Sequence, residues 1–134
     1  MGYIDELGIK AKEAKRSIAS AGTAKKDEIL KKIAEVLRAN VNIILEENAR
    51  DIAAAKDNGI SEAMTDRLRL TKERIDGIAD ACIQLTSLKD PVGEVIEGFT
   101  RPNGMKITKV RVPMGVIGII FESRPNVTVD AATL

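Results

Sequence analysis

The sequence predicts an α/β protein, with a helical layer at its N-terminal side, an antiparallel hairpin and the first strand of a doubly wound sheet. Apolar residues recur every three or four positions through much of residues 1–85, as in amphipathic helices. Asn103-Gly104 lies between two short runs within residues 94–112, and this is a strong hairpin signal. Residues 116–121 are apolar and mostly β-branched, which is typical of a strand buried on both faces of a parallel sheet.

The first half of the chain divides into predicted helices. One helix covers residues 1–20. Residues 24–56 show the most regular apolar spacing. They form either one unbroken helix or two helices that meet near Asn40 and Asn42, because asparagine is a weak helix former. Gly59 ends this segment, since glycine tolerates the left-handed conformation that often follows a helix.

Two shorter helices follow, and Ser61 and Thr71 are their candidate N-caps. The single cysteine, Cys82, falls on the apolar side of the second of these helices. Buried cysteines commonly act as small hydrophobic residues, and the chain has no histidine that would activate a thiol. We therefore interpret Cys82 as a structural residue and not as a nucleophile.

A polar loop, Glu122-Ser123-Arg124-Pro125-Asn126, follows the apolar run and carries residue types suited to a phosphate-bearing ligand. Arginine is a forked donor, serine supplies a hydroxyl and asparagine an amide, and the predicted helix over residues 127–134 offers free backbone amides. Doubly wound proteins bind ligands at the carboxyl ends of their strands. A solvated loop without a ligand is the alternative interpretation.

Composition narrows the classes of partner. The chain has 21 basic and 20 acidic residues and 2% aromatic residues, which argues against nucleic acid and against an anionic membrane surface. The absence of histidine excludes a Ser-His-Asp site and any His-ligated metal built from this chain alone, and we expect no metal site. Residues 1–10 have no signal-peptide pattern, so we expect a cytoplasmic protein.

Residues 110–131 read VRVPMGVIGIIFESRPNVTVDA. This stretch resembles the start of the nucleotide-binding domain in the aldehyde dehydrogenase superfamily, and it is specifically similar to the gamma-glutamyl phosphate reductase family of proline biosynthesis. The resemblance covers nearly the whole chain and includes residues 66–71, whose charges we interpret as solvated or as inter-helix ion pairs. It implies that residues 1–93 are a helical part of the nucleotide-binding domain, 94–112 a hairpin of the oligomerisation arm, and 113–134 the start of an incomplete Rossmann-like core.

The resemblance also implies a function. Enzymes of this family are oxidoreductases that use NADPH to reduce L-glutamyl 5-phosphate to L-glutamate 5-semialdehyde with release of phosphate. Their catalytic cysteine belongs to a later domain, so we expect this chain to be an N-terminal portion that is inactive alone. The expected partners are the small-molecule substrate, glutamate 5-kinase of the same pathway and further copies of the chain in a homo-oligomer.

Site residues follow from the same resemblance. It assigns cofactor contacts to the loop after the predicted strand: Phe121, Glu122, Ser123, Arg124, Pro125 and Asn126. In the superfamily an asparagine in this loop holds the oxyanion. Asn126 is the only asparagine of the loop, whereas Arg124 lies closer to the position of the superfamily's residue, so both are candidate oxyanion or substrate contacts.

Two other functions fit parts of the sequence. The chain is alternatively a non-enzymatic helical interaction module that dimerises through its hairpin by strand addition. It is also similar enough to the wider superfamily to be another member that acts on a free aldehyde. An arginine in the loop favours a phosphorylated substrate over this last alternative.

Overall fold

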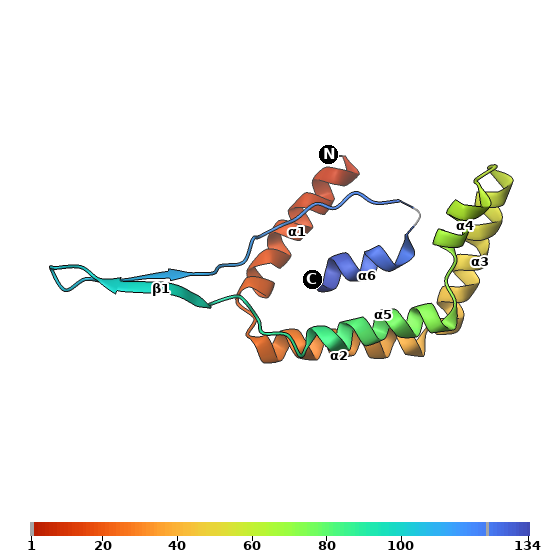
Figure 1. The fold of residues 1–134 in the computed structure, drawn as a ribbon. Helices are drawn as coiled ribbons and strands as arrows, with labels where there is room; N and C mark the ends of the chain where they lie inside the picture. The colour runs from red at the N-terminus through yellow and green to blue at the C-terminus, as the bar shows by residue number, and fades with distance from the viewer. Residues whose placement is uncertain (1, 123) are drawn as a thin grey trace. The chain divides into compact units, whose positions relative to one another are not determined.

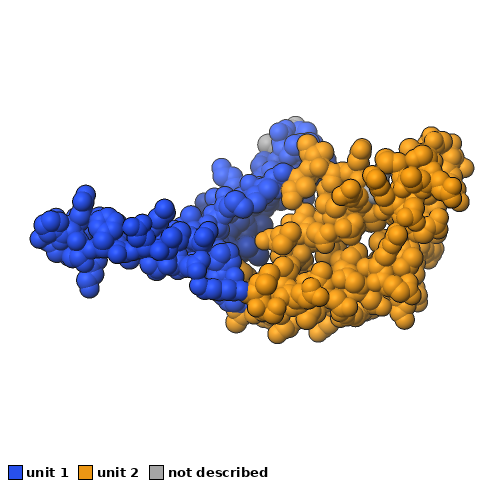
Figure 2. Space-filling model, viewed as in Figure 1, with its two compact units in different colours: residues 1–23, 89–118 blue, residues 24–88, 119–134 orange. Residues whose placement is uncertain are grey.

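The computed structural model describes residues 2–122 and 124–134, and this part of the chain is mostly helical with one two-stranded antiparallel sheet (Figure 1). Its elements, in chain order, are α1 (Tyr3–Ala19), α2 (Thr23–Ala39), α3 (Val41–Asp57), α4 (Glu62–Leu68), α5 (Lys72–Leu85), β1 (Val95–Thr100), β2 (Lys106–Val110) and α6 (Pro125–Thr133). The chain divides into two compact units, one of residues 1–23 and 89–118 and the other of residues 24–88 and 119–134 (Figure 2).

The long apolar pattern of residues 24–56 is two helices, α2 and α3, which meet at Asn40. The side-chain amide of Asn40 donates a hydrogen bond to the carbonyl oxygen of Val36 at 2.8 Å. Such a local bond competes with the regular helical pattern, which explains the break at this residue. After α3, Gly59 has a φ of 70°, so the predicted helix end is confirmed.

Helices α4 and α5 begin at the predicted caps. The Ser61 hydroxyl accepts a hydrogen bond from the backbone N–H of Met64 at 3.4 Å, and the Thr71 hydroxyl accepts one from the N–H of Arg74 at 3.2 Å. Each bond satisfies one of the backbone donors that a helix start leaves free. The Ser61 cap therefore fixes where α4 begins, and the Thr71 cap fixes where the short connection between α4 and α5 ends.

A small core holds together the unit of residues 24–88 and 119–134. Helices α2 and α5 meet at this core, where Ala34 of α2 is buried with Ala79 and Cys82 of α5. Val129 of α6 packs against this cluster, so α6 is attached to α5. Because alanine side chains are short, the facing helices pack closely at this point, and a larger side chain there would force them apart.

The hairpin forms as Asn103-Gly104 predicts, with β1 and β2 antiparallel. Its loop has three residues: the N–H of Arg101 donates to the carbonyl oxygen of Met105 at 2.8 Å, and the N–H of Gly104 donates to the carbonyl oxygen of Arg101 at 2.9 Å. Gly104 has a φ of 83°. A turn followed by one left-handed residue is the usual form of a three-residue hairpin loop, and glycine suits that residue.

The strand predicted at residues 116–121 is not formed within the described residues. The backbone there is neither helix nor strand, and every one of these residues is exposed, with Ile120 at 103%. A parallel strand needs hydrogen-bonded neighbours in the sheet and helices on both faces. The only strands in residues 2–122 and 124–134 are β1 and β2, which pair with each other, so this run has no partner.

Candidate functional site

An open hollow of about 570 Å³ lies where α6 begins, beside the junction of α4 and α5. Three of the predicted loop residues, Arg124, Pro125 and Asn126, line it. Phe121 and Glu122 are not part of its lining, and Ser123 lies outside the described residues. The remaining lining comes from the end of α4, the junction, α5 and α6: Asp66, Arg67, Arg69, Leu70, Arg74, Gly77, Ile78, Ala81 and Asp130.

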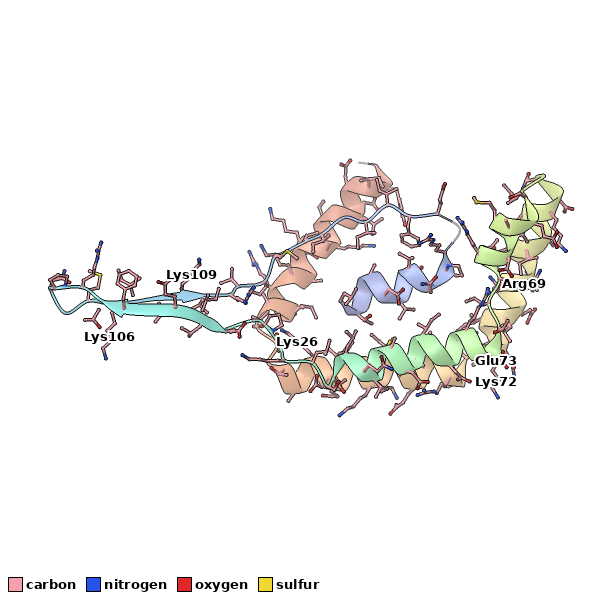
Figure 3. The ribbon with its side chains drawn as sticks, viewed as in Figure 1. Lys26, Arg69, Lys72, Glu73, Lys106 and Lys109 are labelled. Atoms are coloured by element: carbon pink, nitrogen blue, oxygen red, sulfur yellow. The ribbon has the colours of Figure 1, made fainter. Side chains whose placement is uncertain are left out.

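The side chain of Asn48 fixes the backbone at the junction of α4 and α5. Asn48 belongs to α3 and is only 4% exposed. Its amide nitrogen donates to the carbonyl oxygen of Leu68 at 2.9 Å, and its amide oxygen accepts from the N–H of Leu70 at 2.7 Å. Both neighbours of Arg69 are therefore anchored, and Figure 3 shows Arg69 at this junction.

Arg74 supports the same junction from α5. Its guanidinium donates to the carbonyl oxygens of Asp66 and Arg69, and it lies 3.5 Å from the Asp66 carboxylate. A cation next to the carbonyl groups at the end of α4 also interacts favourably with the helix dipole. Arg74 and Asp66 thus form an inter-helix ion pair, which is the role predicted for the charges of residues 66–71.

Three other arginines of the hollow, Arg67, Arg69 and Arg124, have no ion pair or side-chain hydrogen bond with any described residue. Both aspartates of the hollow already have partners, since Asp66 pairs with Arg74 and Asp130 accepts from Asn126. Four arginines therefore face two engaged carboxylates, so the hollow carries a net positive charge. Such a surface attracts anions, and a guanidinium fork matches the oxygens of a phosphate or carboxylate.

Arg124 and Asn126 differ in availability. The side-chain nitrogen of Asn126 donates to the Asp130 carboxylate at 2.9 Å, one turn further along α6. Arg124 is the residue immediately before α6 and its side chain is exposed. Of the two candidates that the sequence proposes, Arg124 has a guanidinium with no partner among the described residues, whereas one of the two amide hydrogens of Asn126 is engaged.

Arg67 and Arg69 were missed by sequence reasoning, which treated their charges as solvated or paired. Their spacing around Leu68 gives no signal of a site, because their position beside Arg124 depends on contacts between distant segments. The only local hint is that Arg69 follows the end of α4, so it lies in a loop and not on a helix face.

Comparison with known proteins identifies what the chain is similar to. No protein-family model matches it. A gamma-glutamyl phosphate reductase from Geobacillus sp. (strain WCH70) is 49% identical over 134 residues, which are 98% of this chain and 32% of that protein. The chain is similar to one part of a gamma-glutamyl phosphate reductase.

Solved structures agree. The crystal structure of gamma-glutamyl phosphate reductase from Thermotoga maritima matches with a TM-score of 0.96 and 45% identity, over 99% of this chain and 32% of that one. The enzyme from Saccharomyces cerevisiae matches with a TM-score of 0.91 and 30% identity, over 99% of this chain and 34% of that one.

The chain thus spans about a third of the length of the gamma-glutamyl phosphate reductases it matches. These matches confirm the resemblance to gamma-glutamyl phosphate reductases that the sequence shows over nearly the whole chain. They do not favour the two alternatives, an interaction module or another member of the wider superfamily.

Cys82 is a core residue beside the hollow and not part of it. Its side chain is 1% exposed, and it packs with Ala34 and Ala79. Burial, and to a smaller extent the charge of Asp130, raise the pKa of the Cys82 thiol. A buried thiol with a raised pKa is a poor nucleophile, which supports the structural interpretation.

Within the described residues, no group of His, Cys, Asp and Glu side chains is arranged to hold a metal ion. None of the helices in the same residues is long and apolar enough to cross a membrane. Among the described residues, the hollow at the start of α6 has the arginine side chains that suit an anionic ligand.

Proposed function

We propose that the complete polypeptide carrying this chain reduces L-glutamyl 5-phosphate to L-glutamate 5-semialdehyde, with NADPH as reductant and release of phosphate, in the cytoplasm. The similarity to gamma-glutamyl phosphate reductases, at 49% identity and at a TM-score of 0.96, is the observation that carries this proposal. Because the chain spans a third of those enzymes, the activity is assigned to the whole enzyme and not to this segment alone.

In this proposal Arg124 donates to the oxygen that gains negative charge when the acyl group is attacked. An oxyanion donor needs an N–H that is free in the resting site, and the guanidinium of Arg124, which directly precedes α6, has no partner among the described residues. The attacking thiolate comes from outside the described residues, because Cys82 is buried. This assignment of the thiolate follows the resemblance, which places the family's catalytic cysteine in a later domain.

Asn126 has a supporting role in the same proposal. Asp130 holds its side-chain nitrogen, so the amide is oriented and one of its hydrogens is engaged. The arginine, the oriented amide and the start of α6 suit the phosphates of a dinucleotide, and NADPH supplies the hydride when it is bound. The loop from Phe121 to Asn126 is proposed to form one wall of that cofactor site.

The hairpin is proposed to contribute to a homo-oligomer. Most of its apolar side chains are exposed, including Phe99 at 50% and Met105 at 57%, and each strand has one edge without a partner in the described residues. Exposed strand edges are templates for pairing with another chain. The proposed pathway partner is glutamate 5-kinase, the enzyme that would supply the acyl phosphate.

The test is an assay of the complete polypeptide, as its own cell makes it, for NADPH oxidation with L-glutamyl 5-phosphate. Arg124→Gln should lower kcat/KM about a hundredfold, the typical effect of losing one oxyanion donor. Asn126→Ala should have a smaller effect, because its amide is already shared with Asp130.

The matched control is Arg50→Gln, since Arg50 pairs with Glu46 and Glu47 on the surface of α3, away from the hollow. Its kcat/KM should equal that of the parent protein. If Arg124→Gln and Asn126→Ala behave like this control, the site assignment is wrong. If the parent protein does not oxidise NADPH with this substrate, the proposed function is wrong.

A further inference from the structure

Arg67 and Arg69 have no part in the proposed reaction as described so far, yet both line the hollow with Arg124. They reach it from the end of α4 and the junction, whereas Arg124 reaches it from the start of α6. Three guanidinium groups from two separate segments share one open concavity. Unpaired like charges placed together repel one another, so an anion between them is stabilising.

The backbone around Arg69 is unusually well fixed for a loop. Asn48 binds the backbone of both of its neighbours, and Arg74 binds the carbonyl oxygens of Asp66 and Arg69. None of these bonds uses the Arg69 side chain. The backbone of Arg69 is therefore held in position while its guanidinium is free, the arrangement that lowers the entropic cost of binding a ligand.

The competing acceptors inside the hollow are already occupied. Asp66 is paired with Arg74, and Asp130 holds the amide of Asn126. Neither carboxylate neutralises Arg67, Arg69 or Arg124. At about 570 Å³ the hollow has space for an anionic group together with the molecule that carries it, against an apolar surface of Leu70, Ile78 and Ala81.

We propose that Arg67, Arg69 and Arg124 form a binding site for a phosphate group. A phosphate offers several acceptor oxygens in different directions, which suits guanidinium forks that approach from two sides better than a single carboxylate does. This inference deepens the proposed function. It rests on the proposed function only for the identity of the molecule that carries the phosphate. That source is either the acyl phosphate substrate or a phosphate of the dinucleotide.

The first experiment is a calorimetric titration of the complete polypeptide with inorganic phosphate, at low ionic strength. Arg69→Gln and Arg124→Gln should each weaken phosphate binding about tenfold or more, because each removes a charge-assisted contact. Arg67→Gln should also weaken phosphate binding. Arg69→Lys should fall between Arg69→Gln and the parent protein, since it keeps the charge and loses the fork.

Arg50→Gln is the control and should bind phosphate as the parent protein does, because it removes a surface arginine outside the hollow. An unchanged melting temperature in the Arg69 variants shows that the junction is intact, as expected when Asn48 holds the backbone and not the side chain. No phosphate binding by the parent protein, or equal binding by all the variants, overturns the proposal.

The second experiment separates the two sources by titrating NADPH and NADH into the parent protein and Arg69→Gln. A loss of affinity for NADPH but not for NADH supports a site for the extra phosphate of NADPH. Unchanged affinity for both nucleotides, with inorganic phosphate competing against the acyl phosphate, supports a substrate site. Phosphate binding that depends on these arginines in a protein without reductase activity would refute the proposed function and leave this site standing.

Discussion

The junction of α4 and α5 and the loop of the β1–β2 hairpin are both short connections, but they are held in different ways. At the junction a buried side chain from α3, Asn48, binds the backbone on both sides of Arg69. In the hairpin the loop residues bind one another and the side chains are exposed. A connection whose backbone is bound by a distant segment can position a functional side chain. A connection stabilised by its own hydrogen bonds forms locally, and its side chains stay available for other contacts.

The strongest test of this comparison removes the amide of Asn48. In Asn48→Ala the carbonyl oxygen of Leu68 and the N–H of Leu70 lose their partner, and each unsatisfied buried group costs on the order of 1–3 kcal/mol. We expect the free energy of unfolding in urea to fall by about 3 kcal/mol. Asn42→Ala, at an exposed position of the same helix, should change it by less than about 0.5 kcal/mol. Similar losses in both variants would show that the junction does not depend on Asn48.

The corresponding change in the hairpin is Gly104→Ala. Gly104 has a φ of 83°, a conformation that costs an L-residue roughly 1–2 kcal/mol. Amide hydrogen exchange should become faster across β1 and β2 and stay unchanged in α5. Gly8→Ala is the matched glycine control, because Gly8 lies inside α1 with open space around it. Gly8→Ala should slow amide exchange in α1. Slower exchange across the hairpin in Gly104→Ala would contradict the turn assignment.

The smallest effect concerns the base of the hairpin, where Glu94 lies 2.6 Å from Lys89 and 3.0 Å from Arg111. The hydrogen bond and charge of Lys89, followed by those of Arg111, lower the pKa of the Glu94 carboxyl below its usual 4.5. The ionised form is therefore favoured in the folded hairpin. Its stabilising contribution is complete above the unfolded pKa and is lost as the pH falls through the lower folded value.

NMR titration of the Glu94 carboxyl measures this pKa. In Glu94→Gln, the contribution of this carboxyl to the pH dependence of hairpin stability should disappear. The effect should be small and should shrink further in high salt, because these side chains are exposed to solvent. A midpoint at or above the ordinary glutamate value would show that the ion pairs do not persist in solution.

Local signals made much of the fold predictable. Ser61 and Thr71 cap helices, and Asn103-Gly104 marks a hairpin, because each acts on residues only a few positions away. Residues 116–121 misled the prediction, because a buried strand is defined by neighbours that the described residues do not supply. The candidate site was only half predictable for a similar reason.

The part of the site that the sequence indicates is the loop with Arg124 and Asn126, which a family resemblance picks out. The part that it does not indicate depends on Asn48, which is 20 residues from Leu68 and 22 from Leu70. The spacing of Arg67 and Arg69 does not show that a side chain of α3 binds the backbone of Leu68 and Leu70. Such long-range contacts appear only when the chain is folded.

The exposed apolar run at residues 116–121 has a practical consequence for anyone who purifies this chain. A short, uncharged, β-branched segment that is open to solvent is prone to self-association. Pro113 before it, and Glu122 and Arg124 after it, are residue types that interrupt such stacking at its ends but not along it. Cooling weakens hydrophobic association, and sulfate or phosphate salts strengthen it. Cold, dilute solutions without such salts are therefore the conditions that keep the sample monodisperse.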